Sequence, residues 1–211
     1  MTVVIAIDGP AGAGKSTVGR AVAHRLGLDY LDTGAMYRAV TYAVMTRGIP
    51  VHDTETVAQI ARDVILDVDD DGGVRVDGAD ATAAIRSRDV TQAVSVIAAN
   101  SGVRAELVER QRAWVRARGG GVVEGRDIAS VVFPDASLKL YVTASPRVRA
   151  ERRVGEIGGD LSEVESAIVE RDRLDSTRAD SPLREADGAI VVDTSDMSID
   201  EVVDRIVELL G

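Results

Sequence analysis

The stretch DGPAGAGKST, residues 8–17, carries one of the two lysines of this 211-residue chain, between a glycine and a hydroxyl side chain. Two glycines flank four residues and are followed by Lys15 and Ser16, which matches the pattern G-x-x-x-x-G-K-[ST]. A β-branched apolar run precedes this loop, and residues at helical spacing follow it. In this context the pattern predicts a phosphate-binding loop, because glycines let backbone N–H groups converge on phosphate oxygens where a helix starts.

The lysine and the hydroxyl of this loop have different expected roles. We expect Lys15 between the β- and γ-phosphates of ATP, and the Ser16 hydroxyl in the shell of a magnesium ion. Because lysine is scarce in the chain, nucleotide binding is favoured over the alternative, a glycine-rich turn that binds nothing. The expected ATP-binding loop consists of Gly9, Pro10, Ala11, Gly12, Ala13, Gly14, Lys15, Ser16 and Thr17.

Short β-branched runs alternate along the chain with segments of helical spacing. The runs have no clean alternation, as is typical of strands buried on both faces, and they predict strands at residues 3–7, 29–31, 121–123, 138–142 and 189–192. Helices are predicted at residues 15–26, 35–47, 103–118, 146–154, 161–173 and 199–210. Alternating strands and helices predict an α/β fold with a parallel sheet.

One stretch departs from this alternation. Residues 64–68 and 74–77 flank the acidic turn DDDGG and predict a β-hairpin. With the helical segments on either side, the hairpin is expected to form an insert off the main sheet, over roughly residues 55–100. The triplet Gly158-Gly159-Asp160 marks a second flexible joint, between two helices.

Charge and composition exclude several classes of protein. The net charge of -10 argues against sequence-independent binding of nucleic acid, which needs a basic surface. The chain has no cysteine, so a disulfide and a thiolate metal site are excluded. The sequence has neither an apolar stretch of membrane-spanning length nor a secretory signal, so we expect a cytoplasmic protein with no membrane partner. Arginines far outnumber the two lysines, and only their placement is informative.

Several classes of protein carry such a phosphate-binding loop, among them switch GTPases, motor ATPases and small-molecule kinases. A switch GTPase needs the guanine-reading pattern Asn-Lys-x-Asp, but Asn100 is the only asparagine of the chain and Ser101 follows it. A motor ATPase needs an acidic residue at the end of an apolar strand, which Glu124 could supply, and an arginine acting in trans, which nothing identifies. A small-molecule kinase therefore remains.

Further motifs make the chain resemble the bacterial cytidylate kinases over nearly its whole length, in order and in spacing. They are Ile7 to Pro10 (IDGP), Leu31 to Arg38 (LDTGAMYR), Gly125 to Ile128 (GRDI), Val132 to Ala136 (VFPDA) and Arg171 to Arg173 (RDR). Ala129 and Ser130 are a departure, because the family more often has Gly and Thr there. The resemblance implies one domain with a three-layer P-loop fold, a five-stranded parallel sheet and an inserted nucleoside-monophosphate-binding part. The core would be about residues 1–54 and 101–211, the insert about 55–100 and a short lid about 153–165.

The resemblance also implies an activity. It is transfer of the γ-phosphoryl group from MgATP to CMP or dCMP, by a monomer with no nucleic-acid partner. The acceptor phosphate is already an anion, so the reaction needs positioning and charge neutralisation more than a base. We therefore assign no role to His24 or His52. The alternatives are a P-loop kinase for shikimate, dephospho-coenzyme A or another monophosphate, and a nucleotide-binding switch that acts through a protein partner.

The resemblance assigns substrate roles residue by residue. Arg38 and Arg126 resemble the clamp on the acceptor phosphate, and Tyr37 resembles a residue lining the acceptor site. The groups expected at the ribose and at a phosphate are Arg171, Asp175 and Arg178. Those expected at the base are Asp127, Arg104 and Ser95, and the motif at residues 31–38 adds Asp32 and Thr33. Lys15, Arg126 and Arg178 are the expected catalytic residues.

Base selection has its own chemical requirement. Cytosine offers a 4-amino donor beside acceptors at N3 and O2, so its selection over uracil needs an acceptor near the amine and donors near N3 and O2. The carboxylate of Asp127 and the guanidinium of Arg104 meet that requirement.

Several of these residues have structural alternatives. Arg149 and Arg153, four apart on a predicted helix, repel each other unless an anion such as ATP lies between them, but Arg153 could instead pair with Glu156. The spacing of Arg171, Asp175 and Arg178 puts them on one helical face if the helix continues that far, and an intrahelical salt bridge would explain two of them. Asp32 and Glu124 follow predicted strands, so either could orient magnesium-bound water, cap a helix or make a turn; Glu124 is the expected magnesium residue.

Overall fold

The structure, a computed structural model, describes residues 3–210 and divides into two compact units. The core unit is formed by the described parts of Met1–Tyr30 and Gly119–Gly211, and the middle unit by Leu31–Arg118. Within the described residues, no helix is both long and apolar enough to cross a membrane.

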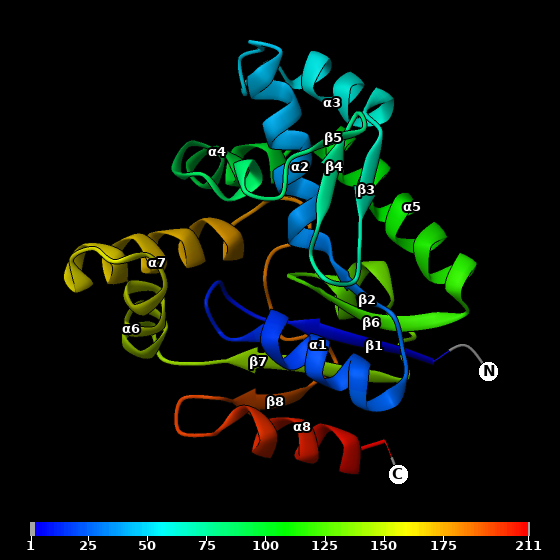
Figure 1. Cartoon of the computed structure of the whole chain (residues 1–211), viewed down its shortest axis with the longest axis vertical. Helices are drawn as coiled ribbons and strands as arrows, with labels where there is room; N and C mark the ends of the chain where they lie inside the picture. The colour runs from blue at the N-terminus through cyan, green and yellow to red at the C-terminus, as the bar shows by residue number, and fades with distance from the viewer. Residues whose placement is uncertain (1–2, 211) are drawn as a thin grey trace. The chain divides into compact units, whose positions relative to one another are not determined.

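A five-stranded sheet organises the core unit, which confirms the predicted α/β class. Its strands run in the order β2-β6-β1-β7-β8 (Figure 1). Their bounds are β1 Val3–Asp8, β2 Tyr30–Asp32, β6 Gly120–Gly125, β7 Leu138–Thr143 and β8 Ile190–Asp193. β1 is central and pairs in parallel with β6 and β7, so that Asp8 lies opposite Gly125 and Tyr141 where the strands end.

Two helices cover one face of this sheet. They are α1 Lys15–Leu26 and α8 Ile199–Glu208, seen beside β1 and β8 in Figure 1. Ile5 and Val142 from the strands, Val22 from α1 and Ile206 from α8 belong to one buried hydrophobic cluster. This cluster is the core beneath the phosphate-binding loop, and it is built from the aliphatic residues that the sequence places in the strands.

Two further helices of the core unit form a pair after β7. They are α6 Pro146–Ile157 and α7 Leu161–Ser176, which pack against each other around the joint at residues 158–160 (Figure 1). Gly158 has a φ of 73°, a conformation that glycine adopts without strain. The Asp160 side chain then caps α7 by accepting from the backbone N–H groups of Ser162 and Glu163.

The middle unit contains the predicted hairpin and helices on both sides of it. Its helices are α2 Thr33–Thr46, α3 Thr54–Asp63, η1 Ala84–Arg86, α4 Arg88–Ala98 and α5 Ser101–Arg118. The strands β3 Leu66–Val68 and β4 Val74–Val76 confirm the hairpin, and β5 Ala79–Asp80 adds a third antiparallel strand. The sequence did not indicate β5, because two residues are too few for a visible alternation.

The compact unit in the middle of the chain is larger than the predicted insert of residues 55–100. It runs over Leu31–Arg118 because α2 packs against α3 and α4, and α5 packs against α3. A second element absent from the prediction is η2, the short π-helix Ile128–Val132 that directly follows β6 and Asp127. The lid over about residues 153–165 stays a prediction.

Candidate active site

The phosphate-binding loop joins β1 to α1. Gly9, Gly12 and Gly14 have φ angles of 149°, 77° and 86°, in the region that favours glycine. A Cβ at Gly9 would also collide with the carbonyl oxygen of Val142 on the neighbouring strand. Lys15 is only 6% exposed, and its Nζ donates to the carbonyl oxygen of Pro10 at 2.9 Å. The backbone of the loop therefore encloses the side chain of Lys15.

The start of α1 is suited to an anion. Gly14 is the N-cap residue, in a left-handed conformation, and no side chain among the described residues caps the helix there. The first backbone N–H groups of a helix lack intrahelical partners, and the helix dipole places positive potential beside them. Phosphate oxygens are the natural acceptors at such a helix start.

Ser16 and Glu124 bring two oxygen groups together at the end of β6. The Ser16 hydroxyl donates to Oε1 of Glu124 at 2.7 Å, and Glu124 is 5% exposed. Hydroxyl and carboxylate oxygens suit Mg²⁺, which takes few protein ligands and fills its shell with water and phosphate oxygens. Within residues 3–210 no cluster of three or more His, Cys, Asp or Glu is set to hold a metal by itself. These two residues therefore fit a magnesium ion that is bound together with a nucleotide.

Arg126 and Asp175 form a mostly buried ion pair. Nε of Arg126 donates to Oδ2 of Asp175 at 2.9 Å, and the two side chains are 19% and 6% exposed. Burial raises the pKa of Asp175, but the charge and hydrogen bond of Arg126, with the charges of Arg171 and Arg178, outweigh it. The pKa of Asp175 is therefore below its ordinary value, and the carboxylate is ionised at neutral pH.

Arg178 does not lie on α7, although its spacing from Arg171 and Asp175 was compatible with a position on that helix. α7 ends at Ser176, so the shared helical face holds for Arg171 and Asp175 alone. The chain instead turns back, and Arg178 donates to the carbonyl oxygens of Asp175 at 3.3 Å and Ser181 at 3.1 Å. Three arginines of the predicted site therefore still surround one carboxylate in the core unit.

The two arginines predicted at the ATP phosphates have different surroundings. Arg149 is 3% exposed and donates to the carbonyl oxygens of Ala144 and Ala11 and, at 2.6 Å, to Asp172. It thus ties α6 to α7 and to the phosphate-binding loop. Arg153 is 38% exposed and pairs with Glu156 at 3.1 Å, the alternative that its spacing left open. A carboxylate of the chain therefore accompanies each of these guanidinium groups.

Asp127 and Asp8 lie close together at the ends of β6 and β1. Asp127 is 5% exposed and directly precedes the π-helix η2. Asp8 is 1% exposed, and its two carboxylate oxygens accept the backbone N–H groups of Ile128 and Ala129, each at 2.8 Å. The pKa of Asp8 is raised to about 6, chiefly by burial, because the two hydrogen bonds and Lys15 offset only part of that effect and the charge of Asp127 adds to it.

In the middle unit, Arg38 and Arg104 are held by neighbouring helices. Nη1 of Arg38, on α2, donates to the Thr91 hydroxyl at 2.8 Å and to the carbonyl oxygen of Ile85 at 3.2 Å. The guanidinium of Arg104 lies 5.8 Å from the centre of the Tyr37 ring, a distance at which cation and ring attract. Both Arg104 and Tyr37 are buried, so this unit holds two of its predicted site residues in contact.

The other predicted residues of the middle unit lie at the start of α2 and on α4. Asp32 caps α2 by accepting from the backbone N–H of Ala35 at 3.0 Å, one of the alternatives for this residue. Thr33 is the first residue of α2 and is buried, and Ser95 is half-buried on α4, one turn after Thr91. α4 therefore presents Thr91 and Ser95 on one face.

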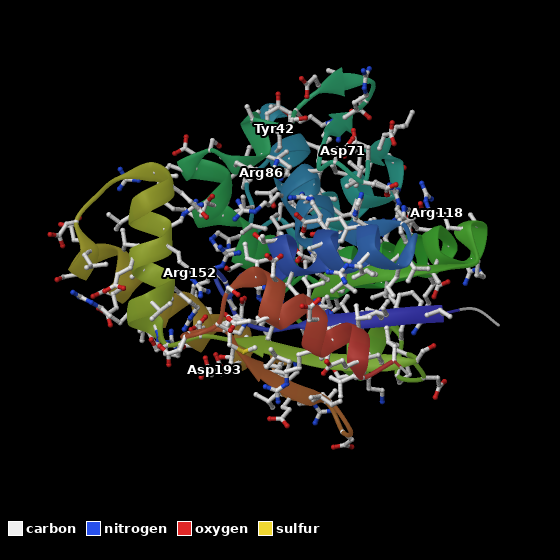
Figure 2. All side chains as sticks on the ribbon, turned by 60° about the horizontal axis from the view of Figure 1, so that its bottom comes forward. Tyr42, Asp71, Arg86, Arg118, Arg152 and Asp193 are labelled. Atoms are coloured by element: carbon white, nitrogen blue, oxygen red, sulfur yellow. The ribbon has the colours of Figure 1, made fainter. Side chains whose placement is uncertain are left out.

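Sequence reasoning did not single out several side chains that hold the site. Arg152 donates to the Thr194 hydroxyl at 3.1 Å and to its carbonyl oxygen at 2.6 Å, and Thr194 donates to the carbonyl oxygen of Ala13 in the loop. Figure 2 labels Arg152 on α6 and Asp193 at the end of β8. Hydrogen bonds from Ser195 hold the pKa of Asp193 below its ordinary value, and the positive charge of Arg152 lowers it further. In the sequence, nothing distinguishes Arg152 from the adjacent Arg153, because only the fold decides which of them faces the loop.

A pocket of about 470 Å³ opens beside the loop within the core unit. Pro10, Tyr141 and Ser145 contribute to its wall, together with the ion-paired Arg149 and Asp172. Burial and the charge of Asp172 raise the pKa of Tyr141, so the phenol stays protonated at neutral pH and can donate a hydrogen bond.

Comparison with known proteins gives a family match. The family model described as "Cytidylate kinase" matches residues 5–211. The chain is 49% identical over 216 residues to the "Bifunctional pantoate ligase/cytidylate kinase" of Prochlorococcus marinus (strain MIT 9303), a match that covers 98% of this chain and 44% of that protein. It is 46% identical over 214 residues to the "Cytidylate kinase" of Streptomyces griseus, covering 99% of this chain and 93% of that protein. The chain thus spans less than half the length of the bifunctional relatives.

Solved structures resemble the fold at low sequence identity. A shikimate kinase from Bacteroides thetaiotaomicron is similar with a TM-score of 0.51 and 15% identity, covering 99% of this chain and 98% of that one. The protein TT1252 from Thermus thermophilus is similar with a TM-score of 0.52 and 16% identity, covering 99% and 95%. At this level of identity the likeness concerns the fold alone.

Proposed function

The chain belongs to the cytidylate kinase family, and we propose that it transfers the γ-phosphoryl group of ATP to CMP or dCMP, giving ADP and CDP or dCDP. The observation that carries this proposal is the phosphate-binding loop, with its buried Lys15 and a helix start suited to anions. The core unit adds three arginines gathered round Asp175, the kind of cation cluster that phosphoryl transfer uses.

The proposed mechanism divides the donor and acceptor between different residues. The loop from Gly9 to Thr17 binds the ATP phosphates through its backbone N–H groups, and Lys15 lies between the β- and γ-phosphates. Bound Mg²⁺ would neutralise charge on the phosphates, and Ser16 and Glu124 are the residues that would hold it. Arg149 and Arg153 of α6 are the proposed further ATP contacts. Arg149 also keeps the loop in shape, because it donates to the carbonyl oxygen of Ala11.

The acceptor phosphate is held for attack by Arg38 and Arg126. Its oxygen needs no general base, because the phosphate is already ionised, so orientation and charge neutralisation do most of the catalytic work. Lys15, Arg126 and Arg178 stabilise the charge that spreads over the transferred group. Guanidinium groups suit this role, since their rigid fork matches two phosphate oxygens at once.

The remaining residues select the nucleotide. Arg171 and Asp175 hold the ribose, and Asp32, Thr33 and Tyr37 contribute to the acceptor site. Ser95, Arg104 and Asp127 read the base: the Asp127 carboxylate accepts the 4-amino group of cytosine and rejects the carbonyl of uracil. The buried position of Arg104 against Tyr37 supports its part, because a packed guanidinium is held in one orientation.

The proposal also covers the state of the protein. We propose a cytoplasmic monomer that acts on small nucleotides without a nucleic-acid or membrane partner. The net charge of -10 supports the absence of a nucleic-acid partner, because a surface of that charge repels nucleic acid. Sedimentation of the purified chain with and without CMP tests the monomeric state, and a stable dimer would contradict it.

A coupled ADP-release assay tests the activity. The acceptors are CMP, dCMP, UMP, AMP, shikimate and dephospho-coenzyme A, each with ATP and Mg²⁺. We expect turnover with CMP and dCMP well above that with the other acceptors. Faster turnover with shikimate, dephospho-coenzyme A or AMP would replace the proposal by another P-loop kinase, and ATP binding without turnover on any acceptor would favour a nucleotide switch.

A further inference from the structure

Asp8 is the one ionisable residue of β1, and it lies directly before the phosphate-binding loop. Its carboxylate accepts the backbone N–H of Ile128 through Oδ1 and that of Ala129 through Oδ2, both at 2.8 Å. With 1% of its surface exposed, the group is buried completely within the core unit. Burial of a carboxylate costs free energy, because the charge loses its hydration. The apolar residues in the rest of β1 have no such cost, so the buried position of Asp8 calls for an explanation.

The two N–H groups belong to the first residues of η2, the turn that follows Asp127. An aspartate directly before a helical turn commonly accepts such N–H groups with its own side chain. Within residues 3–210, the Asp127 side chain makes no capping bond to this turn. Asp8, from another strand, performs the capping instead, and the Asp127 carboxylate is not used for it.

The direction of the Asp127 side chain depends on the backbone on both sides of it. Before Asp127, the register between β1 and β6 holds Gly125 opposite Asp8. After Asp127, the two bonds to Asp8 hold Ile128 and Ala129. Hydrogen bonds to an ionised acceptor are roughly twice as strong as neutral ones, and two of them restrict both rotation and translation of the turn.

We propose that Asp8 is a positioning residue for base selection, which fixes the backbone after Asp127 and thereby directs the Asp127 carboxylate at the 4-amino group of cytosine. This inference rests on the proposed function, in which Asp127 reads the base. Asp8 touches no substrate in this role and acts through Asp127. Its backbone is held by pairing with β6 and β7, so the adjoining loop keeps its shape without the side-chain charge.

The Asp8→Asn variant tests the proposal with the smallest change of shape. The amide has one oxygen that accepts an N–H and one nitrogen that cannot, so one of the two backbone groups loses its acceptor. We expect the ratio of kcat/KM for CMP to that for UMP to fall on the order of tenfold, the effect of one charged hydrogen bond. The KM for CMP should carry the change, while kcat and the KM for ATP stay within about twofold.

A matched control and a double variant separate positioning from a general structural effect. Asp53 also accepts a backbone N–H, that of Thr56 at the start of α3, and has no role in the proposed site, so Asp53→Asn is expected to leave the ratio unchanged. In the Asp127→Ala background, Asp8→Asn should lower the ratio no further, since Asp8 acts through that carboxylate. An equal fall of the ratio in both backgrounds would overturn the proposal.

A measurement on the unaltered protein covers the case in which Asp8→Asn fails to fold. By hydrogen exchange, the amides of Ile128 and Ala129 should be protected as strongly as those of β6, and rapid exchange of both would overturn the inference. Different results would refute base reading by Asp127 and positioning by Asp8. Equal use of CMP and UMP by the unaltered protein would refute base reading itself, whereas a preference for CMP that Asp8→Asn keeps would refute only the role of Asp8.

Discussion

The hydroxyl of Ser16 donates a hydrogen bond of 2.7 Å to Glu124, although 108 positions separate the two residues in the chain. The sheet explains the contact, because β1 and β6 are parallel neighbours and end side by side. Ser16 follows β1 by way of the loop, and Glu124 lies near the end of β6. One strand pairing therefore brings together the two oxygen groups that suit magnesium.

Replacement of Glu124 by glutamine should weaken the response to magnesium. The amide keeps the shape but loses the charge, so the concentration of Mg²⁺ at half-maximal activity should rise on the order of tenfold. A titration of activity with Mg²⁺ at saturating ATP measures this. Glu109→Gln, at an exposed residue paired with Arg112, is the control and should leave the titration unchanged. An unaltered titration in Glu124→Gln would remove this residue from the magnesium site.

The two lysines of the chain provide their own comparison. Lys15→Met should lower kcat by roughly a hundredfold or more, because one preorganised cation at the transferred phosphoryl group is lost. Lys139, whose Nζ donates to the carbonyl oxygen of Asp187, lies on β7, and Lys139→Met should keep full activity. Steady-state kinetics with ATP and CMP distinguishes the two. Similar activities of the two variants would contradict the role of Lys15.

Thr91 should matter for the acceptor but not for the donor. Its hydroxyl accepts from Arg38 at 2.8 Å, so Thr91→Val keeps the shape of the side chain and removes the acceptor. We expect the KM for CMP to rise on the order of tenfold with the KM for ATP unchanged, since Arg38 loses one of its anchors. Thr91→Ser retains the hydroxyl and should restore the KM for CMP. A serine variant as weak as the valine variant would point to packing instead.

Removal of Asp175 should destabilise the protein in a pH-dependent way. Asp175→Asn leaves Arg126 without its mostly buried ionic partner, which costs about 3 kcal/mol at neutral pH. Because the pKa of Asp175 is lowered in the folded chain, its contribution is present above the ordinary value of 3.8 and is lost as pH falls through the lowered value.

Thermal unfolding of the two proteins from pH 7 downwards checks this sign. The difference in stability between the unaltered chain and Asp175→Asn should be largest near neutral pH and shrink in acid. Asp204→Asn, at an exposed aspartate paired with Arg25, is the control, and its effect should stay below about 1 kcal/mol. A difference that grows in acid would show that the pKa of Asp175 is raised instead.

The local elements of the fold could be predicted from the sequence. Glycines in the loop, β-branched runs and helical spacing act over a few residues, and these patterns predicted the five strands of the core sheet and the hairpin of β3 and β4. The loop motif depends on local backbone geometry in the same way. Gly12 and Gly14 adopt positive φ angles that other residues rarely reach, so the pattern itself carries the information.

The partner of each charged side chain was decided by the tertiary structure. Arg149 and Arg153 are equivalent by spacing, yet one is buried against Asp172 and the other is exposed beside Glu156. The extent of the compact unit around α2 and α5 likewise depends on packing between helices that are far apart in sequence.

Asp8 is the clearest case of this difference. The sequence showed a carboxylate at the end of a strand, and local patterns say nothing about which backbone groups it meets. Its two carboxylate oxygens accept backbone N–H groups from residues 120 and 121 positions away in the chain, across a pairing of parallel strands. Local conformational preferences thus determined the phosphate-binding loop, the strands and the helices. The partners of the buried charges followed only from chain segments that the folded sheet brings together, because hydrogen bonds and ion pairs act over a few ångströms in space regardless of distance along the chain.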